Sequence, residues 1–153
     1  LVVTGANADE VVTAARRACA RTIHNPDYET GDMLSSLQTG LRAALNQNAA
    51  AALVVLGDQP SIRYRNVRRV LHAYATGRGR IIAPSHLMRR GHPILIDSVY
   101  WQEILDLPAG SAARDVINRH AGSIAYVETD DSVLRDIDTP EAYAEERRRA
   151  EKR

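Results

Sequence analysis

A short apolar run at residues 53–56, with the sequence Leu-Val-Val-Leu, constrains the fold of this chain more than any other stretch. Four consecutive apolar residues, two of them β-branched, predict a strand buried on both faces, as in the middle of a parallel sheet. Gly57 ends the run and Asp58 follows directly. Ligands bind at the carboxyl ends of the strands in open α/β sheets, so Asp58 is a candidate ligand-binding residue. A carboxylate there suits Mg²⁺, which takes oxygen ligands; alternatively, Asp58 only accepts hydrogen bonds from loop N–H groups.

Strand and helix patterns alternate along the rest of the chain. Strands are predicted at residues 1–4, 22–24, 80–83, 94–96, 124–127 and 133–134. Helices are predicted at residues 8–18, 34–45, 63–74, 99–105 and 112–120, and from residue 140 into a charged tail. No repeat, linker or low-complexity segment interrupts the pattern. The alternation is typical of the α/β class and predicts a single three-layer domain over residues 1–153.

Composition narrows the function classes. The chain is 44% hydrophobic and 25% charged, which is ordinary for a soluble globular protein. No apolar run approaches the length of a membrane span and no signal peptide is present, so we expect no membrane partner. Cys19 is the single cysteine, which excludes an internal disulfide and favours a reducing, cytoplasmic setting. The net charge of +1 gives no general attraction to nucleic acid.

A polar loop leads into the second predicted helix. It begins at Asn25 and contains Gly31, while Ser35 and Ser36 fall in the first turn of the helix. Backbone N–H groups are unpaired in a first turn and the helix dipole is positive there. The loop is therefore a candidate anion site, and the alternative is plain capping of the helix by serine.

A second carboxylate pair precedes the last helix. Alternation along an extended segment places Asp136 and Asp138 on one side and Ile137, which we expect to be buried, on the other. We expect the carboxylates of Asp136 and Asp58 to lie within about 10 Å, close enough to share an ion and one water shell. The alternative is that Asp138 caps the last helix together with Thr139.

Four motifs in register resemble a known family. They are Asn25-Pro26 with Gly31 and Ser35-Ser36-Leu37-x-x-Gly40-Leu41, then Leu56-Gly57-Asp58-Gln59-Pro60, then Arg90-Gly91-His92-Pro93-Ile94-Leu95, and finally Asp136-Ile137-Asp138-Thr139-Pro140-Glu141. Together they resemble the MobA-like NTP transferases, most closely the molybdenum cofactor cytidylyltransferase (MocA-like) branch. The resemblance spans essentially the whole chain.

The resemblance implies a Rossmann-like, GT-A-type nucleotidyltransferase fold with a mostly parallel sheet. It implies Mg²⁺-dependent transfer of CMP or GMP from CTP or GTP to a molybdopterin-type phosphate acceptor, with release of pyrophosphate. Two alternatives stay open. The acceptor could be another small phosphate ester or a sugar phosphate, or the chain could be a noncatalytic nucleotide-binding module.

The resemblance also implies roles for particular residues. Asp58 and Asp136 look like the catalytic, metal-binding carboxylates, with Asp138 as a further metal ligand. Substrate binding is implied for Asn25, Gly31, Ser35, Ser36 and Gln59, and for an acceptor-side loop of Gly91, His92 and Pro93.

One departure from the family is large. Its members begin with a strand and the loop Leu-Ala-Ala-Gly-x-Ser-x-Arg-Met-Gly-x-x-Lys, which nothing in this sequence resembles. We therefore expect the chain to be N-terminally truncated relative to the family by about fifty residues, the size of a βα unit with its loop. The fragment alone is expected to be inactive, to bind CTP or GTP weakly, and to associate through strand edges left uncovered.

Overall fold

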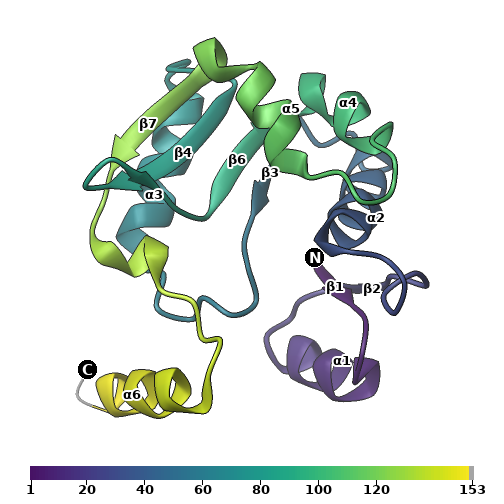
Figure 1. Ribbon diagram of the computed structural model, residues 1–153, viewed down its shortest axis with the longest axis vertical. Helices are drawn as coiled ribbons and strands as arrows, with labels where there is room; N and C mark the ends of the chain where they lie inside the picture. Colours follow the sequence, from purple (N-terminus) through teal and green to yellow (C-terminus); the bar gives the residue numbers. More distant parts are fainter. Residues whose placement is uncertain (152–153) are drawn as a thin grey trace. The chain divides into compact units, whose positions relative to one another are not determined.

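The structure is a computed structural model that describes residues 1–151 (Figure 1). The chain divides into two compact units. The first unit contains Leu1–Ala52 and Asp97–Ala121, and the second contains Leu53–Ile96 and the chain from Gly122 onward. The end of the predicted charged tail, residues 152–153, lies outside the described residues. A single domain over the whole chain stays a prediction, and each unit is described by itself.

The first unit is built on a short parallel strand pair. Its elements are β1 (Val2–Thr4), α1 (Ala8–Arg17), β2 (Thr22–His24), α2 (Met33–Leu45), the 3₁₀ helix η1 (Ser98–Tyr100), α4 (Trp101–Leu105) and α5 (Ala113–Arg119). β1 and β2 pair in parallel with Val3 opposite Ile23, which confirms the predicted βαβ order. Leu41 of α2 and Trp101 and Ile104 of α4 are almost wholly buried, so these two helices form the core of this unit.

The second unit is built on a mixed sheet. Its elements are α3 (Tyr64–Ala75), β4 (Ile81–His86), β5 (Arg89–Arg90), β6 (Ile94–Asp97), η2 (Ala121–Ser123), β7 (Ile124–Glu128), η3 (Asp131–Leu134) and α6 (Pro140–Ala150). The strand order is β3-β6-β4-β5, with β7 also paired to β4. The boundaries between the units fall within β3 (Ala51–Val54), at the last residue of β6 and at the first residue of η2. β4 runs parallel to β7 and antiparallel to β5 and β6. The predicted α/β class is confirmed.

The buried centre of this sheet is β4 rather than the run at residues 53–56. Ile81, Ile82 and Ala83 are completely buried, because strands pair on either side of β4 and α3 packs against it. β3 lies at one end of the strand order, is only half-buried, and stops before Val55, which is 56% exposed. The prediction of a strand buried on both faces was therefore wrong for these residues.

Two further predictions near the C-terminus have opposite outcomes. The strand predicted at residues 133–134 is the 3₁₀ helix η3, which begins where the Asp130 carboxylate accepts a hydrogen bond from the backbone N–H of Ser132. The predicted start of the last helix is confirmed, because the Thr139 hydroxyl accepts a hydrogen bond from the N–H of Ala142 at 3.1 Å and Pro140 is the first helical residue. Within residues 1–151, no helix is both long and apolar enough to cross a bilayer.

Candidate active site

The turn after β3 and the segment after η3 lie side by side in the second unit. The backbone N–H of Ile137 donates a hydrogen bond to the carbonyl of Asp58 at 2.9 Å. The side-chain amide of Gln59 donates from Nε2 to Oδ1 of Asp136 at 2.5 Å. Asp136 therefore lies beside the Asp58 turn, as the sequence predicted. We call Asp58, Gln59 and Asp136 the carboxylate cluster.

The members of the carboxylate cluster differ in exposure. Asp58 and Asp136 are exposed, whereas only 5% of Gln59 is exposed. Within the described residues, no hydrogen bond or ion pair reaches the carboxylate of Asp58. The alternative in which Asp58 only accepts hydrogen bonds from loop N–H groups is therefore wrong, and this carboxylate is available to a ligand.

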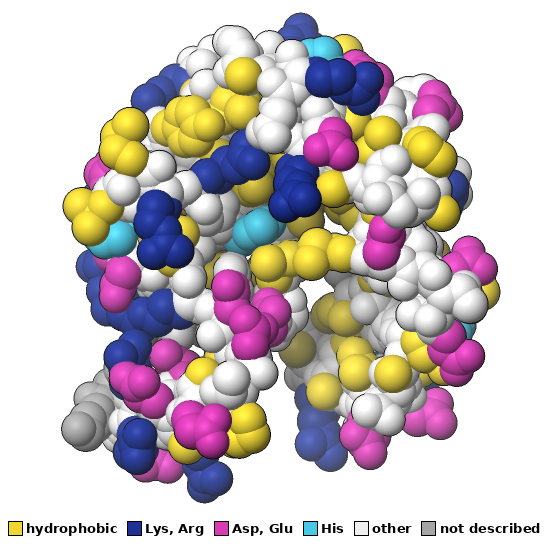
Figure 2. All heavy atoms as spheres, viewed as in Figure 1, with side chains coloured by type: hydrophobic (Ala, Val, Ile, Leu, Met, Phe, Trp, Pro, Cys, Tyr) yellow, Lys and Arg dark blue, Asp and Glu magenta, His cyan; other side chains and the backbone are white. Residues whose placement is uncertain are grey.

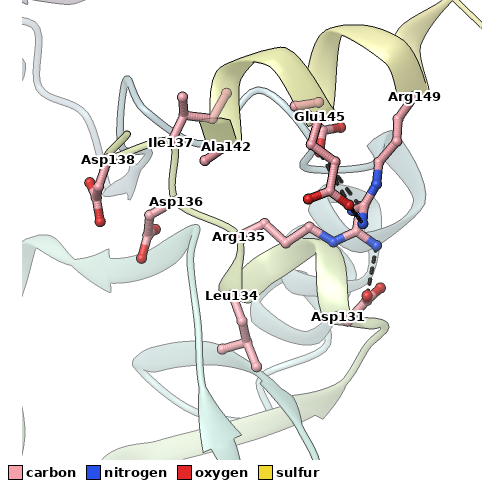
Figure 3. Close-up of a pocket in the computed structure, with 10 residues that line it drawn as sticks. Asp131, Leu134, Arg135, Asp136, Ile137, Asp138, Ala142, Glu145 and Arg149 are labelled. Carbon is pink, nitrogen blue, oxygen red and sulfur yellow. Dashed lines mark hydrogen bonds and ion pairs between the residues drawn. The ribbon is translucent and has the colours of Figure 1, made fainter. Parts of the chain in front are cut away.

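The orientation of residues 136–138 follows the predicted alternation. Figure 3 shows the carboxylates of Asp136 and Asp138 on one side of the chain and Ile137 on the other. Ile137 is only half-buried, so the expectation that it is buried was wrong. Residues 136–138 do not form a strand of the sheet, and the Asp58 turn packs against one side of them, which leaves Ile137 partly exposed. Asp138 makes no capping bond to α6, because Thr139 alone fills that role.

The predicted acceptor-side loop meets the same segment. The N–H of His92 donates to the carbonyl of Val133 at 3.1 Å, and Gly91 and Pro93 are buried. A Cβ on Gly91 would lie 2.2 Å from the carbonyl oxygen of Val133, so only glycine fits this close approach. The loop is thus held against η3 and leads directly into β6.

The electrostatics of His92 connect this loop to the carboxylate cluster. Burial lowers the pKa of His92 below its ordinary value of 6.5, and the positive charge of Arg90 lowers it further. The negative charges of Asp136 and Asp58 raise this pKa, but they do not overcome burial. His92 is therefore neutral at pH 7 and lies within electrostatic reach of both carboxylates.

The donor atoms of the carboxylate cluster suit a hard cation. Mg²⁺ is usually held by one or two carboxylates and completes its shell with water and substrate phosphates. Asp58 and Asp136 offer two exposed carboxylates, and the buried Oε1 of Gln59 has no hydrogen-bond partner. Among residues 1–151, no three His, Cys, Asp or Glu side chains form a metal-binding group, and Asp138 as a further metal ligand stays a prediction.

A hollow of about 450 Å³ lies between η3, the segment after it and α6 (Figure 3). Asp136 and Asp138 line one part of it. Arg135 lines another part and is paired with Asp131 at 2.6 Å and with Glu146 at 3.8 Å. The hydrogen bond that Arg135 donates to the carboxylate of Asp131 raises the pKa of Arg135, so this arginine is fixed in its charged form. Because its charge is already neutralised, Arg135 is a poor candidate for binding phosphate.

Sequence reasoning missed a buried network that supports η3. Asn66 of α3 is completely buried and donates to Asp130 and Ser132, both at 3.1 Å. Arg65 donates to Asp130 at 2.6 Å. Burial alone would raise the pKa of Asp130, but the hydrogen bonds from Ser132, Arg65 and Asn66 outweigh it and hold the pKa well below its ordinary value. This network fixes the start of the segment that carries Asp136.

The candidate residues of the first unit lie in one loop whose polar side chains form hydrogen bonds within the loop. Asn25 is 1% exposed, and its Nδ2 donates to the hydroxyls of Ser35 at 2.9 Å and Ser36 at 3.1 Å. The N-cap of α2 is Asp32, whose carboxylate accepts from the N–H groups of Leu34 and Ser35. The structure therefore favours the capping alternative over the anion site, with aspartate rather than serine as the cap.

Gly31 closes the same loop. A Cβ at this position would lie 2.3 Å from the hydroxyl of Ser35 and 2.6 Å from the carbonyl of Asp27, so the loop packs only around glycine. Asn25, Gly31, Ser35 and Ser36 have structural roles that account for their residue types. Their part in substrate binding stays a prediction.

A family model described as the MobA-like NTP transferase domain matches residues 1–124. The chain belongs to the MobA-like NTP transferase family. The family resemblance read from the four motifs is thereby confirmed, and the chain is a nucleotidyltransferase at the level of its family. The matched range includes Asp58 and His92 but ends before Asp136, so the case for Asp136 rests on its geometry.

Proteins with different names are similar to this chain. Nicotine blue oxidoreductase of Paenarthrobacter nicotinovorans is 33% identical over 148 residues, which covers 92% of this chain and 71% of that protein. A nucleotidyl transferase from Methanothermobacter has a TM-score of 0.76 at 23% identity, covering 97% of this chain and 71% of that one. Molybdopterin-guanine dinucleotide biosynthesis protein A from Archaeoglobus fulgidus has a TM-score of 0.62 at 12% identity, covering 99% and 79%. The two solved structures confirm the Rossmann-like fold.

A third solved structure, Rv0371c from Mycobacterium tuberculosis, is in complex with manganese. It has a TM-score of 0.64 at 20% identity and covers 94% of this chain and 74% of that one.

Proposed function

We propose that this protein is a Mg²⁺-dependent nucleotidyltransferase that transfers CMP or GMP from CTP or GTP to a molybdopterin-type phosphate acceptor and releases pyrophosphate. The observation that carries the proposal is that Asp136, an exposed carboxylate, lies beside the turn after β3 that contains a second exposed carboxylate, Asp58. Such a transfer requires positioning and charge neutralisation more than a nucleophilic side chain. The cytoplasmic setting is part of the proposal, in keeping with the free, exposed thiol of Cys19.

Different residues of the candidate site have different roles in the proposed reaction. Asp58 and Asp136 would hold Mg²⁺, which supplies charge stabilisation to the phosphate oxygens when bound. His92 is neutral at pH 7, so it adds no positive charge that would compete with the ion. The buried Gly91 and Pro93 fix the position of His92 beside the two carboxylates. We propose that this loop faces the acceptor.

Three other functions are separated from this one by experiment. The acceptor could be a sugar phosphate or another small phosphate ester, which keeps the same carboxylates and changes only the product. The chain could be a noncatalytic nucleotide-binding module. A redox function is favoured by one observation, which is the 33% identity over 92% of this chain to a protein named as an oxidoreductase.

The test is a transfer assay with the full-length protein, including the N-terminal loop expected from the family resemblance, and CTP or GTP labelled at the α-phosphorus. With Mg²⁺ and molybdopterin we expect Mg²⁺-dependent release of pyrophosphate and transfer of the label to the acceptor. Replacing the acceptor with a sugar phosphate separates the acceptor classes. Nucleotide binding without turnover would support the noncatalytic module. Oxidation or reduction of nicotine blue, with no pyrophosphate release, would support the redox function.

A further inference from the structure

Gln59 has an unusual hydrogen-bonding state for a buried side chain. Only 5% of the residue is exposed, and its Nε2 donates to Oδ1 of Asp136 at 2.5 Å. The orientation of the amide is fixed by chemistry, because a carboxylate accepts hydrogen bonds and only the NH₂ group of glutamine donates. The Oε1 of Gln59 is therefore the buried atom without a partner.

An unpartnered buried acceptor is unfavourable. Leaving one typically costs about 1–3 kcal/mol, and an apolar side chain of the same size would avoid that cost. Packing of the turn after β3 therefore does not explain the amide of Gln59. The explanation must lie in the bond that the amide makes to Asp136.

Asp136 depends on Gln59 for its orientation. The backbone bond from Ile137 to the carbonyl of Asp58 holds the two main chains together, but it leaves the side chain of Asp136 free to rotate. Asp136 is exposed, and within the described residues the amide of Gln59 is the one hydrogen-bond donor to its carboxylate.

We infer that Gln59 is a positioning residue that holds the carboxylate of Asp136 beside Asp58, so that both can bind the same divalent ion. The inference rests on the metal site of the proposed function. It differs from direct substrate binding by Gln59, because an amide with 5% exposure offers almost no surface to a substrate. Groups that orient a metal ligand in this way typically change metal affinity or activity by about 10- to 100-fold when they are removed.

The test measures binding of Mn²⁺ alone to the full chain by electron paramagnetic resonance, so it does not depend on turnover. Gln59→Met keeps a side chain of similar length and removes the donor, and we expect the Kd for Mn²⁺ to rise about tenfold or more. Asp136→Asn should raise it at least as much. In the Asp136→Asn background, Gln59→Met should have no further effect, because its target is gone.

A matched control is available in the first unit. Gln102 of α4 donates from Nε2 to Oδ1 of Asp106 at 2.8 Å, which is the same type of bond between two exposed side chains. Gln102→Met should leave the Kd for Mn²⁺ unchanged. If Gln59→Met does not fold, as judged by its thermal transition, Gln59→Leu is the second variant and carries the same expectation.

The outcomes separate the inference from the proposed function. Wild-type Mn²⁺ affinity in Gln59→Met, together with weak binding in Asp136→Asn, would overturn the positioning role and leave the metal site intact. Equal effects of Gln59→Met in the wild-type and Asp136→Asn backgrounds would also overturn it, since Gln59 would not act through Asp136. Unchanged affinity in both Asp58→Asn and Asp136→Asn would refute the metal site itself.

Discussion

The loop at residues 25–36 and the carboxylate cluster use their polar groups in opposite ways. In the loop, the amide of Asn25 bonds to Ser35, Ser36 and the N–H of Asp27, and the carboxylate of Asp32 fills the start of α2. In the carboxylate cluster, Asp58 is exposed and its carboxylate has no hydrogen bond among the described residues, and the carboxylate of Asp136 has one. The polar groups of the loop form hydrogen bonds to one another, whereas the carboxylates of the cluster can still accept further bonds.

This difference distinguishes a structural polar motif from a candidate site. Buried polar groups stabilise a fold only when their hydrogen bonds are complete, and those of Asn25 are. A site has to bind something, so some of its groups must be left for the ligand. The carboxylate cluster meets this condition. Acidic, basic and apolar side chains are interspersed on the face of the molecule that Figure 2 shows.

The largest expected effect tests the carboxylate cluster, where the carboxylate of Asp58 is available to a ligand. Asp58→Asn is nearly isosteric and removes an exposed charge, so the thermal transition should be unchanged. In the full-length enzyme, the rate of nucleotidyl transfer should fall by about a hundredfold or more, because the charge that holds the metal is lost. Steady-state kinetics with varied Mg²⁺ measures this effect.

Asp9→Asn, at an exposed aspartate in the first turn of α1, is the control and should keep the wild-type rate. Near-normal turnover of Asp58→Asn with unchanged Mg²⁺ dependence would show that the free carboxylate is not the metal ligand, and the contrast between the two regions would lose its functional meaning.

The second effect tests the loop at residues 25–36, whose polar groups form hydrogen bonds to one another. Asn25→Ala leaves two hydroxyls and one N–H without their partner, and it opens a small cavity at a residue that is 1% exposed. We expect the free energy of unfolding to fall by about 1–3 kcal/mol, measured by urea denaturation. Asn46→Ala, at an exposed C-cap, is the matched control and should change it by less than about 0.5 kcal/mol. If both variants have the same stability, the loop does not depend on its internal bonds.

The fold was predictable where the local pattern is strong. The βαβ order of the first unit and the Thr139-Pro140 start of α6 were read correctly because periodicity and capping are local properties. The apolar run at residues 53–56 was assigned to the buried centre wrongly, since burial depends on neighbours that the sequence does not specify. The completely buried strand is β4, where Ile81 and Ile82 are covered by strands on both sides.

The candidate site was predictable to a similar extent. The pairing of Asp136 with the Asp58 turn followed from the family motifs and the alternation of residues 136–138. The sequence did not reveal that Gln59 bonds to Asp136, or that Asn66 bonds to Asp130, because both contacts join segments more than sixty residues apart. Such contacts depend on the tertiary fold and have no local signature.

The smallest expected effect tests whether the two regions differ because of the hydrogen bonds of their polar groups or because of the unit to which they belong. Asp130 belongs to the second unit, like the carboxylate cluster, yet its carboxylate is closed by Ser132, Arg65 and Asn66. Its folded-state pKa is below its ordinary value of 3.8, so it stabilises the fold at a pH above that value. This stabilisation is lost as the pH falls below 3.8 toward the depressed pKa, where the folded carboxylate also becomes protonated.

Asp130→Asn should therefore be less stable than the wild type at pH 7, and the difference should shrink as the pH falls below about 4. We expect a smaller loss than for Asn25→Ala, because the side chain of Asp130 is 22% exposed and water screens its ion pairs. Thermal unfolding from pH 7 to pH 2 measures the difference, with Asp27→Asn, at an exposed carboxylate, as the control. A stability difference that does not change with pH would show that Asp130 acts by packing alone. Loss of nucleotidyl transfer with unchanged stability would show that Asp130 takes part in the function. The hydrogen bonding of a carboxylate would then not distinguish a structural residue from a site residue.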